Sequence, residues 1–380
     1  MKTEQTKWTP EKGWQPAAPG TLGDAADLVF VFGATELLRT GALTEPLAAL
    51  YPRAHVVGCT TAGEIEGTHV EDGTMVVTAI AFERTRVVAR CIEVGSNGDS
   101  FARGAELAAS LFPKDLAHVF VLSDGLIVNG SELAKGMSSA LPAGVMVTGG
   151  LSGDGARFAE TFVVWEGRPR RNAVVALGFY GDRIRVGHGC LGGWDTFGPE
   201  RIVTRSRGNV LFELDGKSAL ELYKQYLGEH ARGLPATGLL FPLSVRQSGS
   251  KESVVRTILS IDEAAQSMTF AGDVPEGSVA RLMRANIDRL VDGAIGAAQS
   301  TCALSKDAHP ELAILISCVG RKLVLKQRVE EEVEGVRDVL GEETCLAGFY
   351  SYGEISPSTP SVRCELHNQT MTITTFSEHE

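Results

Sequence analysis

Short continuous runs of apolar residues alternate along this chain with stretches whose apolar residues recur every three or four positions. Such runs are typical of strands buried on both faces of a sheet, and such stretches are typical of amphipathic helices. The alternation extends from about residue 25 to residue 182 and resumes near the C-terminus. It predicts an α/β fold in which β-α-β units form mainly parallel or mixed sheets covered by helices.

The same order of elements occurs three times. Each copy has an apolar run, a glycine turn, a helix-like stretch, a second apolar run and a loop ending in Gly-Glu or Gly-Asp. The copies begin at Asp27, His118 and Leu312, and their loops end at Glu64, Asp154 and Glu354. The outer two copies continue alike, with Thr74-Met75 matching Thr370-Met371. Because duplicated segments keep their supersecondary structure, we expect equivalent β-α-β units with these loops at corresponding strand ends.

The chain is long enough for two or three domains. We expect a polar N-terminal arm over residues 1–24, a first domain over residues 25–217 and a second over residues 218–380. Asp215-Gly216, just before the expected boundary, is typical of a hairpin turn. The longest predicted helix covers Val279–Ala298.

Composition narrows the class of protein. The formal net charge is −11 and the basic residues are scattered, so neither nucleic acid nor an anionic membrane surface is an expected partner. No apolar run approaches the length of a membrane-spanning helix, and the N-terminus has no signal-peptide pattern. The seven cysteines include no Cys-x-x-Cys pair, which favours reduced thiols in the cytoplasm.

Motifs for common enzyme chemistry are weak or absent. Gly187–Gly192 matches the spacing of a dinucleotide-binding loop, but the glycines and the proline of Gly193–Pro199 exclude the helix that should follow it. The sequence has neither a phosphate-binding loop for nucleoside triphosphates nor the nucleophile elbow of hydrolases. We therefore expect a protein that is not an enzyme and has no catalytic residues.

The Gly-Glu and Gly-Asp loops have two interpretations. They could be turns in which glycine adopts a positive φ and the acid caps the next element. Alternatively, they could line a ligand pocket, as loops at strand ends do in α/β folds. On the second interpretation, we expect six residues beside one cavity between the two domains: Cys59, Thr61, Glu64, Tyr350, Tyr352 and Glu354.

Two of the eight histidines, His188 and His367, are candidates for holding a cofactor. Zinc needs about four ligands, and no such set is visible. A haem iron needs as few as one imidazole in an apolar pocket. If haem binds, His367 is the first choice for the ligand of the iron and His188 is the second. The alternative is that His367 bonds the neighbouring backbone.

Several of these motifs together resemble the FIST family. They are Val57–Ile65, Gly149–Asp154, Arg207–Leu220, Leu346–Ile355 and His367–Thr370. The resemblance covers nearly all of residues 25–376 and implies an intracellular sensory protein for small ligands, built from an N-terminal and a C-terminal FIST domain. Stand-alone members include haem proteins called NosP, which sense nitric oxide and regulate a histidine kinase or cyclic-di-GMP enzymes. Other members are thought to bind small metabolites such as amino acids.

Together, these observations predict a cytoplasmic ligand sensor of signal transduction. The leading ligand is haem with nitric oxide at the iron, and the expected partner is a histidine kinase or a cyclic-di-GMP enzyme. The alternative is a small metabolite such as an amino acid, held by the Gly-Glu loops without haem. A metabolic enzyme is the third interpretation. The chain could also form a homodimer.

Overall fold

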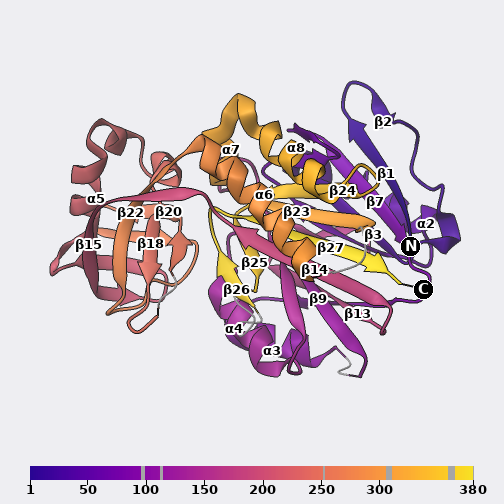
Figure 1. Cartoon of the computed structure of the whole chain (residues 1–380), viewed down its shortest axis with the longest axis horizontal. Coiled ribbons are helices and arrows are strands. Elements are labelled where there is room, and N and C mark those ends of the chain that lie inside the picture. Colours follow the sequence, from indigo (N-terminus) through magenta and orange to yellow (C-terminus); the bar gives the residue numbers. More distant parts are fainter. Residues whose placement is uncertain (96–98, 112–113, 251–252, 305–309, 358–363, 380) are drawn as a thin grey trace.

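The computed structural model describes residues 1–95, 99–111, 114–250, 253–304, 310–357 and 364–379. These residues form three mixed sheets, one antiparallel sheet and several helices, so the fold is of the α/β class. Three of the sheets pack together into one body, and the fourth belongs to a unit at its side (Figure 1). Among the described residues, no helix is long and apolar enough to cross a membrane.

Each sheet of the body contains a parallel pair of strands with a third strand antiparallel to the first of the pair. The first unit has β3 (Leu28–Gly33), α1 (Thr35–Leu38), α2 (Glu45–Leu50), β4 (His55–Thr60) and β7 (Met75–Ala81). The second has β9 (Leu116–Ser123), α4 (Gly130–Ala140), β10 (Met146–Leu151) and β13 (Ala173–Tyr180). The third has β23 (Leu312–Cys318), α7 (Val319–Leu325), α8 (Val329–Leu340), β24 (Cys345–Ser351) and β27 (Met371–Glu378).

The three units exchange strands in a closed cycle. After its second parallel strand, each unit sends the chain into the sheet of another unit, through a stretch that we call a crossing segment. The crossing segments are residues 61–66 with β5 (Glu64–Glu66), residues 152–165 with β11 (Val163–Trp165), and residues 352–356 with β25 (Gly353–Ser356). Strand β5 pairs with β24, β11 with β4, and β25 with β10. No sheet is therefore complete without a neighbour's strand.

Further elements extend and cover the three sheets. Additional strands are β1 (Lys2–Thr9), β2 (Gly13–Gln15), β6 (His69–Glu71), β8 (Arg86–Glu93), β12 (Arg168–Arg170), β14 (Ile184–Leu191) and β26 (Glu365–His367). The other helical segments are α3 (Ser100–Ala109), α6 (Ile287–Leu304), η1 (Gly23–Ala25) and η4 (Lys326–Arg328). Helices α3 and α4 pack together beside the second sheet, and α6 and α8 beside the third. Burial on both faces explains why the central strands are continuous apolar runs.

Aromatic pairs join the inner faces of the three sheets. Phe30 of the first sheet meets Phe120 of the second with ring centroids 5.3 Å apart. Phe32 meets Phe349 of the third sheet at 4.7 Å. Phe179 of the second sheet meets Phe376 of the third at 5.0 Å. Each sheet thus contacts both of the others through large, fully buried rings, which contribute strongly to a core of this kind.

Residues 194–285 fold around the fourth sheet and are called the inserted unit here, because they separate β14 from α6. The strands are β15 (Trp194–Arg207), β16 (Val210–Leu214), β17 (Lys217–Ser218), β18 (Leu243–Arg246), β19 (Val254–Arg256), β20 (Ile258–Asp262), β21 (Ser267–Phe270) and β22 (Val279–Ala285). The helical segments are α5 (Ala219–Leu227), η2 (Gly228–Gly233) and η3 (Ala236–Leu240). Figure 1 shows this unit at the left, with the body and both chain termini to its right.

Some expectations from the sequence differ from these elements. The first 24 residues include β1 and β2, which extend the first sheet, because β1 pairs with β7 and β2 pairs with β1. The Asp215-Gly216 turn is confirmed, with φ values of +52° and +71°, and it lies inside the fourth sheet. The helix predicted over Val279–Ala298 is wrong in its first part, because Val279–Ala285 forms β22 between β18 and β15.

A buried ion pair holds the inserted unit's connections to the body. Arg321 and Glu332 are both fully buried, with Arg321 Nη2 2.6 Å from Glu332 Oε2. Arg321 also donates to the carbonyl oxygens of Gly192 at 3.1 Å and Leu290 at 2.7 Å. Gly192 lies on the connection from β14 to the inserted unit, and Leu290 lies near the start of α6, just after the inserted unit. The guanidinium therefore joins the two chain connections to α7 and α8.

We predict that Arg321→Met destabilises the protein by about 3–5 kcal/mol, because it leaves the Glu332 carboxylate buried without its cation. The free energy of unfolding, measured by denaturant titration, checks this value. Arg328→Met is the control, since Arg328 pairs with Asp288 and Glu331 at the surface. Equal stability of the two variants would contradict the importance given to the buried pair.

Candidate functional site

A cleft of about 640 Å³ opens where the crossing segments of the first two units meet helix α7 of the third. We call it the crossing cleft. It is lined by residues in four stretches, 34–36, 61–64, 72–73 and 154–157, and by the side of α7 that faces them. Its size is that of pockets for small molecules. It lies beyond the carboxyl ends of β3, β4, β10 and β23, where α/β folds commonly bind ligands.

Glu64 is held at the edge of this cleft by hydroxyl groups. Its side chain is almost fully buried, and one carboxylate oxygen accepts a short hydrogen bond from Thr61. The other oxygen accepts from the backbone N–H and the hydroxyl of Thr74, at 3.0 and 2.8 Å. Burial raises the pKa of Glu64 to about 7, although these donors oppose the shift.

Glu354 has the same set of partners in the third unit. It accepts from the Ser351 hydroxyl at 2.6 Å and from the N–H and hydroxyl of Thr370 at 3.2 and 2.9 Å. Burial raises its pKa to about 7 as well, against the effect of these hydrogen bonds. The matching Thr74-Met75 and Thr370-Met371 pairs in the sequence therefore supply equivalent donors to two equivalent carboxylates.

The acid of the second crossing segment has different partners. Asp154 accepts from the Tyr352 hydroxyl and from the backbone N–H groups of Phe158, Ala159 and Glu160 at 2.8–2.9 Å. It thereby fixes the loop that forms one wall of the crossing cleft. Of the three loop glycines only Gly63 has a positive φ, at +137°, and Glu64 and Glu354 bond distant hydroxyl groups instead of capping the next element. Glu64 and Asp154 also line the cleft.

Charged side chains of both signs stand around the cleft. Lys322 of α7 donates to the carbonyl oxygen of Ala62 at 2.9 Å, pairs with Asp72 and lies 5.5 Å from the ring centroid of Tyr350. Arg157 pairs with Glu36, and both of these side chains are about half exposed. The cleft therefore offers cations and carboxylates to a ligand, with small apolar residues such as Ala62 between them.

The six residues expected around one cavity lie in three different places in the structure. The first and third loops do lie side by side, since Ala62 N donates to Tyr350 O and Tyr350 N donates to Gly63 O, both at 2.8 Å. Of the six, only Thr61 and Glu64 line the crossing cleft. Tyr352 lines a separate cavity of about 180 Å³ beside residues 125–129.

The other three expected residues are buried. Cys59 lies in the core between the sheets, where burial raises the pKa of its thiol. Tyr350 is buried behind Lys322, with its hydroxyl donating to Glu332 at 2.6 Å. Glu354 is enclosed by its own hydrogen-bond partners.

The two candidate haem ligands do not fit a haem site in this structure. His367 Nε2 lies 3.1 Å from the carbonyl oxygen of Ser356, which is the backbone bond considered as the alternative. Burial disfavours its charged form, but the neighbouring Cys190 outweighs this effect and raises the pKa of His367 to about 9. An iron ligand must instead be a neutral imidazole. Neither His367 nor His188 lines the crossing cleft or the cavity beside Tyr352.

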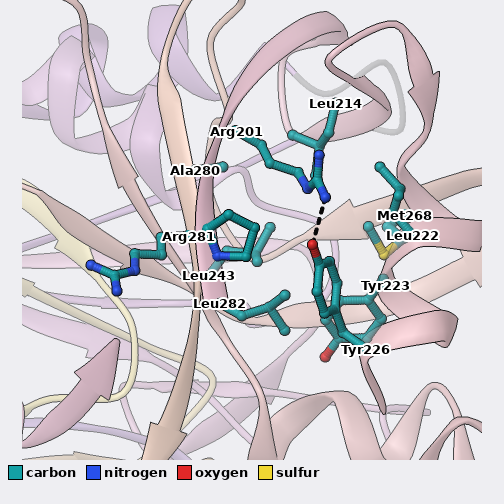
Figure 2. Close-up of a pocket in the computed structure, with 11 residues that line it drawn as sticks. Arg201, Leu214, Leu222, Tyr223, Tyr226, Leu243, Met268, Ala280, Arg281 and Leu282 are labelled. Atoms are coloured by element: carbon teal, nitrogen blue, oxygen red, sulfur yellow. Dashed lines mark hydrogen bonds between the residues drawn. The ribbon is translucent and has the colours of Figure 1, made fainter. Parts of the chain in front are cut away.

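No group of three or more His, Cys, Asp or Glu side chains within the described ranges could hold a metal ion. A small hollow in the inserted unit, shown in Figure 2, is also too narrow for a ligand. Its volume of about 10 Å³ suits about one water molecule. There Arg201 Nη2 donates to the Tyr226 hydroxyl at 2.5 Å, between leucine side chains of the surrounding sheet and α5.

Sequence reasoning missed Lys322, Arg157 and Asp72. Lys322 lies in α7, three residues after the start of the helix that follows β23. Because ligands bind at the carboxyl ends of parallel strands, its position in the sequence was a signal for a binding residue. Arg157 and Asp72 are surface residues in loops, and their positions beside the cleft depend on how distant segments pack.

We predict that the two buried glutamic acids make the protein less stable as the pH rises. Their folded pKa values, about 7, exceed the ordinary value of 4.5, so the folded state binds these protons more tightly. The resulting stabilisation is complete below pH 4.5 and is lost as the pH rises through 7, by roughly 3 kcal/mol for each group.

Unfolding by denaturant between pH 4.5 and pH 8 measures this slope. Glu64→Gln and Glu354→Gln should each flatten it, whereas Glu334→Gln, at an exposed position, should not. An unchanged slope in both of the first two variants would refute the assignment.

Comparisons with known proteins give one family and several weak similarities. An uncharacterised protein of Methanocaldococcus jannaschii is 22 % identical over 383 aligned positions, covering 88 % of this chain and 70 % of that protein. Among solved structures, a chorismatase aligns with a TM-score of 0.36 and 8 % identity, over 99 % of this chain and 98 % of that one. A cyanuric acid hydrolase aligns with a TM-score of 0.34 and 10 % identity, over 99 % of each chain. Neither structural similarity is strong enough to indicate a fold or a function.

Two family models match the chain itself. The FIST N domain matches residues 27–217 and the FIST C domain matches residues 219–357. FIST domains generally act as sensors of small ligands in signal transduction. Because the two matches together cover most of its length, this chain belongs to the FIST family.

Proposed function

We propose that the chain senses a small polar metabolite, of the size and charge of an amino acid, in the crossing cleft. The observation that carries this proposal is the composition of the cleft, in which the cations Lys322 and Arg157 and the carboxylates Asp72 and Glu36 line one open space. A zwitterion has one cationic and one anionic group. Its carboxylate can bind the cations of the cleft and its ammonium can bind the carboxylates, and these charge-assisted hydrogen bonds replace those to water. A ligand with charge of only one sign would be repelled by part of the wall.

Lys322 is the anchor for a ligand carboxylate in this proposal. Its ammonium is only slightly exposed, and it is held in place by Ala62, Asp72 and the ring of Tyr350. Fixing the group in advance reduces the entropy that is lost when the ligand binds. Glu36 and Asp72 are the nearby carboxylates for a ligand ammonium.

We predict that some members of a panel of amino acids raise the thermal unfolding midpoint of the purified protein by a few degrees at millimolar concentration. Ligand at 100 times its Kd stabilises the folded state by about 2.7 kcal/mol. Lys322→Gln should abolish the shift, and isothermal titration should confirm the loss of binding. Lys224→Gln, which removes a lysine paired with Glu263 on the inserted unit, is the matched control. Failure of every amino acid to bind, or the same binding to the Lys322 variant, would contradict the proposal.

A signalling role follows if occupancy of the cleft alters contacts with another protein. A histidine kinase or a cyclic-di-GMP enzyme is the proposed partner, and a cytoplasmic location fits either one. Ligand-dependent change in the autophosphorylation rate of a co-purifying kinase would support this role. We also propose that the chain itself catalyses no reaction. Formation of a modified amino acid when the purified protein is incubated with amino acids would contradict this.

Haem with nitric oxide at the iron is the alternative function. The contacts of His367 and His188 do not favour it, so we expect no histidine-ligated haem spectrum when the protein is expressed with ample haem. Absorption spectra of the wild type, His367→Ala and His188→Ala test this expectation. A Soret band that shifts with nitric oxide and disappears in one variant would instead establish haem sensing and identify the ligand.

A further inference from the structure

A second cavity lies between the inserted unit and the body. Its volume is about 200 Å³, and its walls come from β18 and β19 on one side and from α4 and β26 on the other. Apolar side chains form much of the wall, among them Val245, Val254 and Leu366. None of the residues that line the crossing cleft lines this cavity.

A buried guanidinium lies in this wall. The side chain of Arg256 is almost fully buried, with 4 % exposure. Its Nε donates to the carbonyl oxygen of Asp273 at 3.0 Å, and its Nη1 donates to those of Val255 and Leu366 at 3.2 and 3.0 Å. The acceptors found for it are therefore backbone carbonyls, which carry only partial charges.

The charge of Arg256 is not matched by a carboxylate in direct contact. Among the described residues, it forms no ion pair, and its Nη2 has no hydrogen-bond partner. Asp273, whose backbone carbonyl accepts from Arg256, bonds Lys135 at 2.7 Å and Asn129 at 3.1 Å through its carboxylate. Burial lowers the pKa of Arg256 to about 10, which Glu365 and Asp273 oppose only in part.

A buried charge without a counter-ion is costly, and such groups normally have a partner. An anion in the cavity would supply it through the free Nη2. The wall also includes Lys135, which pairs with Asp273, and the two carboxylates of Asp273 and Glu365, which disfavour ligands with two or more negative charges. The valine and leucine side chains favour an apolar body on the remainder of the ligand.

We propose that this cavity is a second binding site, which takes a small monocarboxylic acid with an apolar body. The ligand carboxylate accepts from Arg256 Nη2, and its apolar body packs against Val245, Val254 and Leu366. The site is separate from the crossing cleft, and it does not depend on the function proposed for that cleft. Because its walls belong to two parts of the chain, the occupant joins the inserted unit to the body.

Butyrate is the probe, and butyramide, which has the same shape without the charge, is its control. Differential scanning fluorimetry at constant ionic strength should show a higher unfolding midpoint with tens of millimolar butyrate, and isothermal titration should give a saturable heat. Butyramide and inorganic phosphate should produce neither effect. Equal responses to butyrate and butyramide would overturn the proposal, because the guanidinium would then have no part in binding. A stronger response to phosphate would replace the monocarboxylate with a phosphate ligand and would also overturn it.

Two variants locate the binding. Arg256→Gln should abolish the response to butyrate, whereas Arg201→Gln, at the hollow of Figure 2, should keep it. Because Arg256→Gln removes three backbone contacts and could impair folding, Val254→Phe gives an independent test. Val254 is partly exposed at the cavity, so a larger ring can fill the space while Arg256 remains. Retained butyrate binding in a folded Val254→Phe protein would overturn the proposal.

Hydrogen exchange and a cleft variant separate the two sites. Butyrate should slow amide exchange in peptides from β18 and β26, on both sides of the cavity. Lys322→Gln should leave the response to butyrate unchanged, because it alters only the crossing cleft. Loss of butyrate binding in that variant would place the probe in the cleft and would refute a second site.

Discussion

Hydrogen bonding to the buried acids of the crossing segments is the interaction on which the body of this protein depends. Each segment must leave one sheet and enter another, so its backbone cannot continue either ladder through the turn. Thr61 and Thr74 hold Glu64, and Ser351 and Thr370 hold Glu354, with donors to both carboxylate oxygens in each case. A buried carboxyl group without such donors would cost several kcal/mol. The hydrogen bonds of Glu64 hold the first crossing segment in its turn, and because Glu64 lines the crossing cleft they also fix the edge of that cleft.

The sequence predicts the individual strands and helices of this arrangement better than it predicts which strands pair with each other. Continuous apolar runs identify β3, β9 and β23, since strands covered on both faces need no polar side. The Gly-Glu pattern indicates that the first and third loops are alike, and both change from strand to bend to strand. Which sheet receives the strand after each turn is a long-range choice, as the pairing of Ile65 with Gly348 illustrates. No local periodicity contains that information.

The site was harder to predict than the fold because its polar residues look ordinary in the sequence. Lys322 stands beside Arg321 in a short helix, and either could be read as a solvated surface residue. Packing separates them, because Arg321 is fully buried against Glu332 whereas Lys322 reaches across to Ala62 of the first unit. The strand Val279–Ala285 was similarly ambiguous. Its apolar residues suit both periods, and pairing on both sides with β18 and β15 decides the outcome.

Helix α7 links the crossing cleft physically to the inserted unit. Lys322 faces the cleft, Arg321 bonds both connections of the inserted unit, and α7 also contacts η3 within that unit. On the same side, Gln369 donates to the carbonyl oxygen of Leu239 in η3 at 3.1 Å and lies against Gly320, where a Cβ would meet its side-chain nitrogen. Any displacement of α7 by a ligand must therefore change contacts at the connections or at η3, because close-packed elements cannot absorb it locally. This geometry connects the crossing cleft through α7 to the inserted unit.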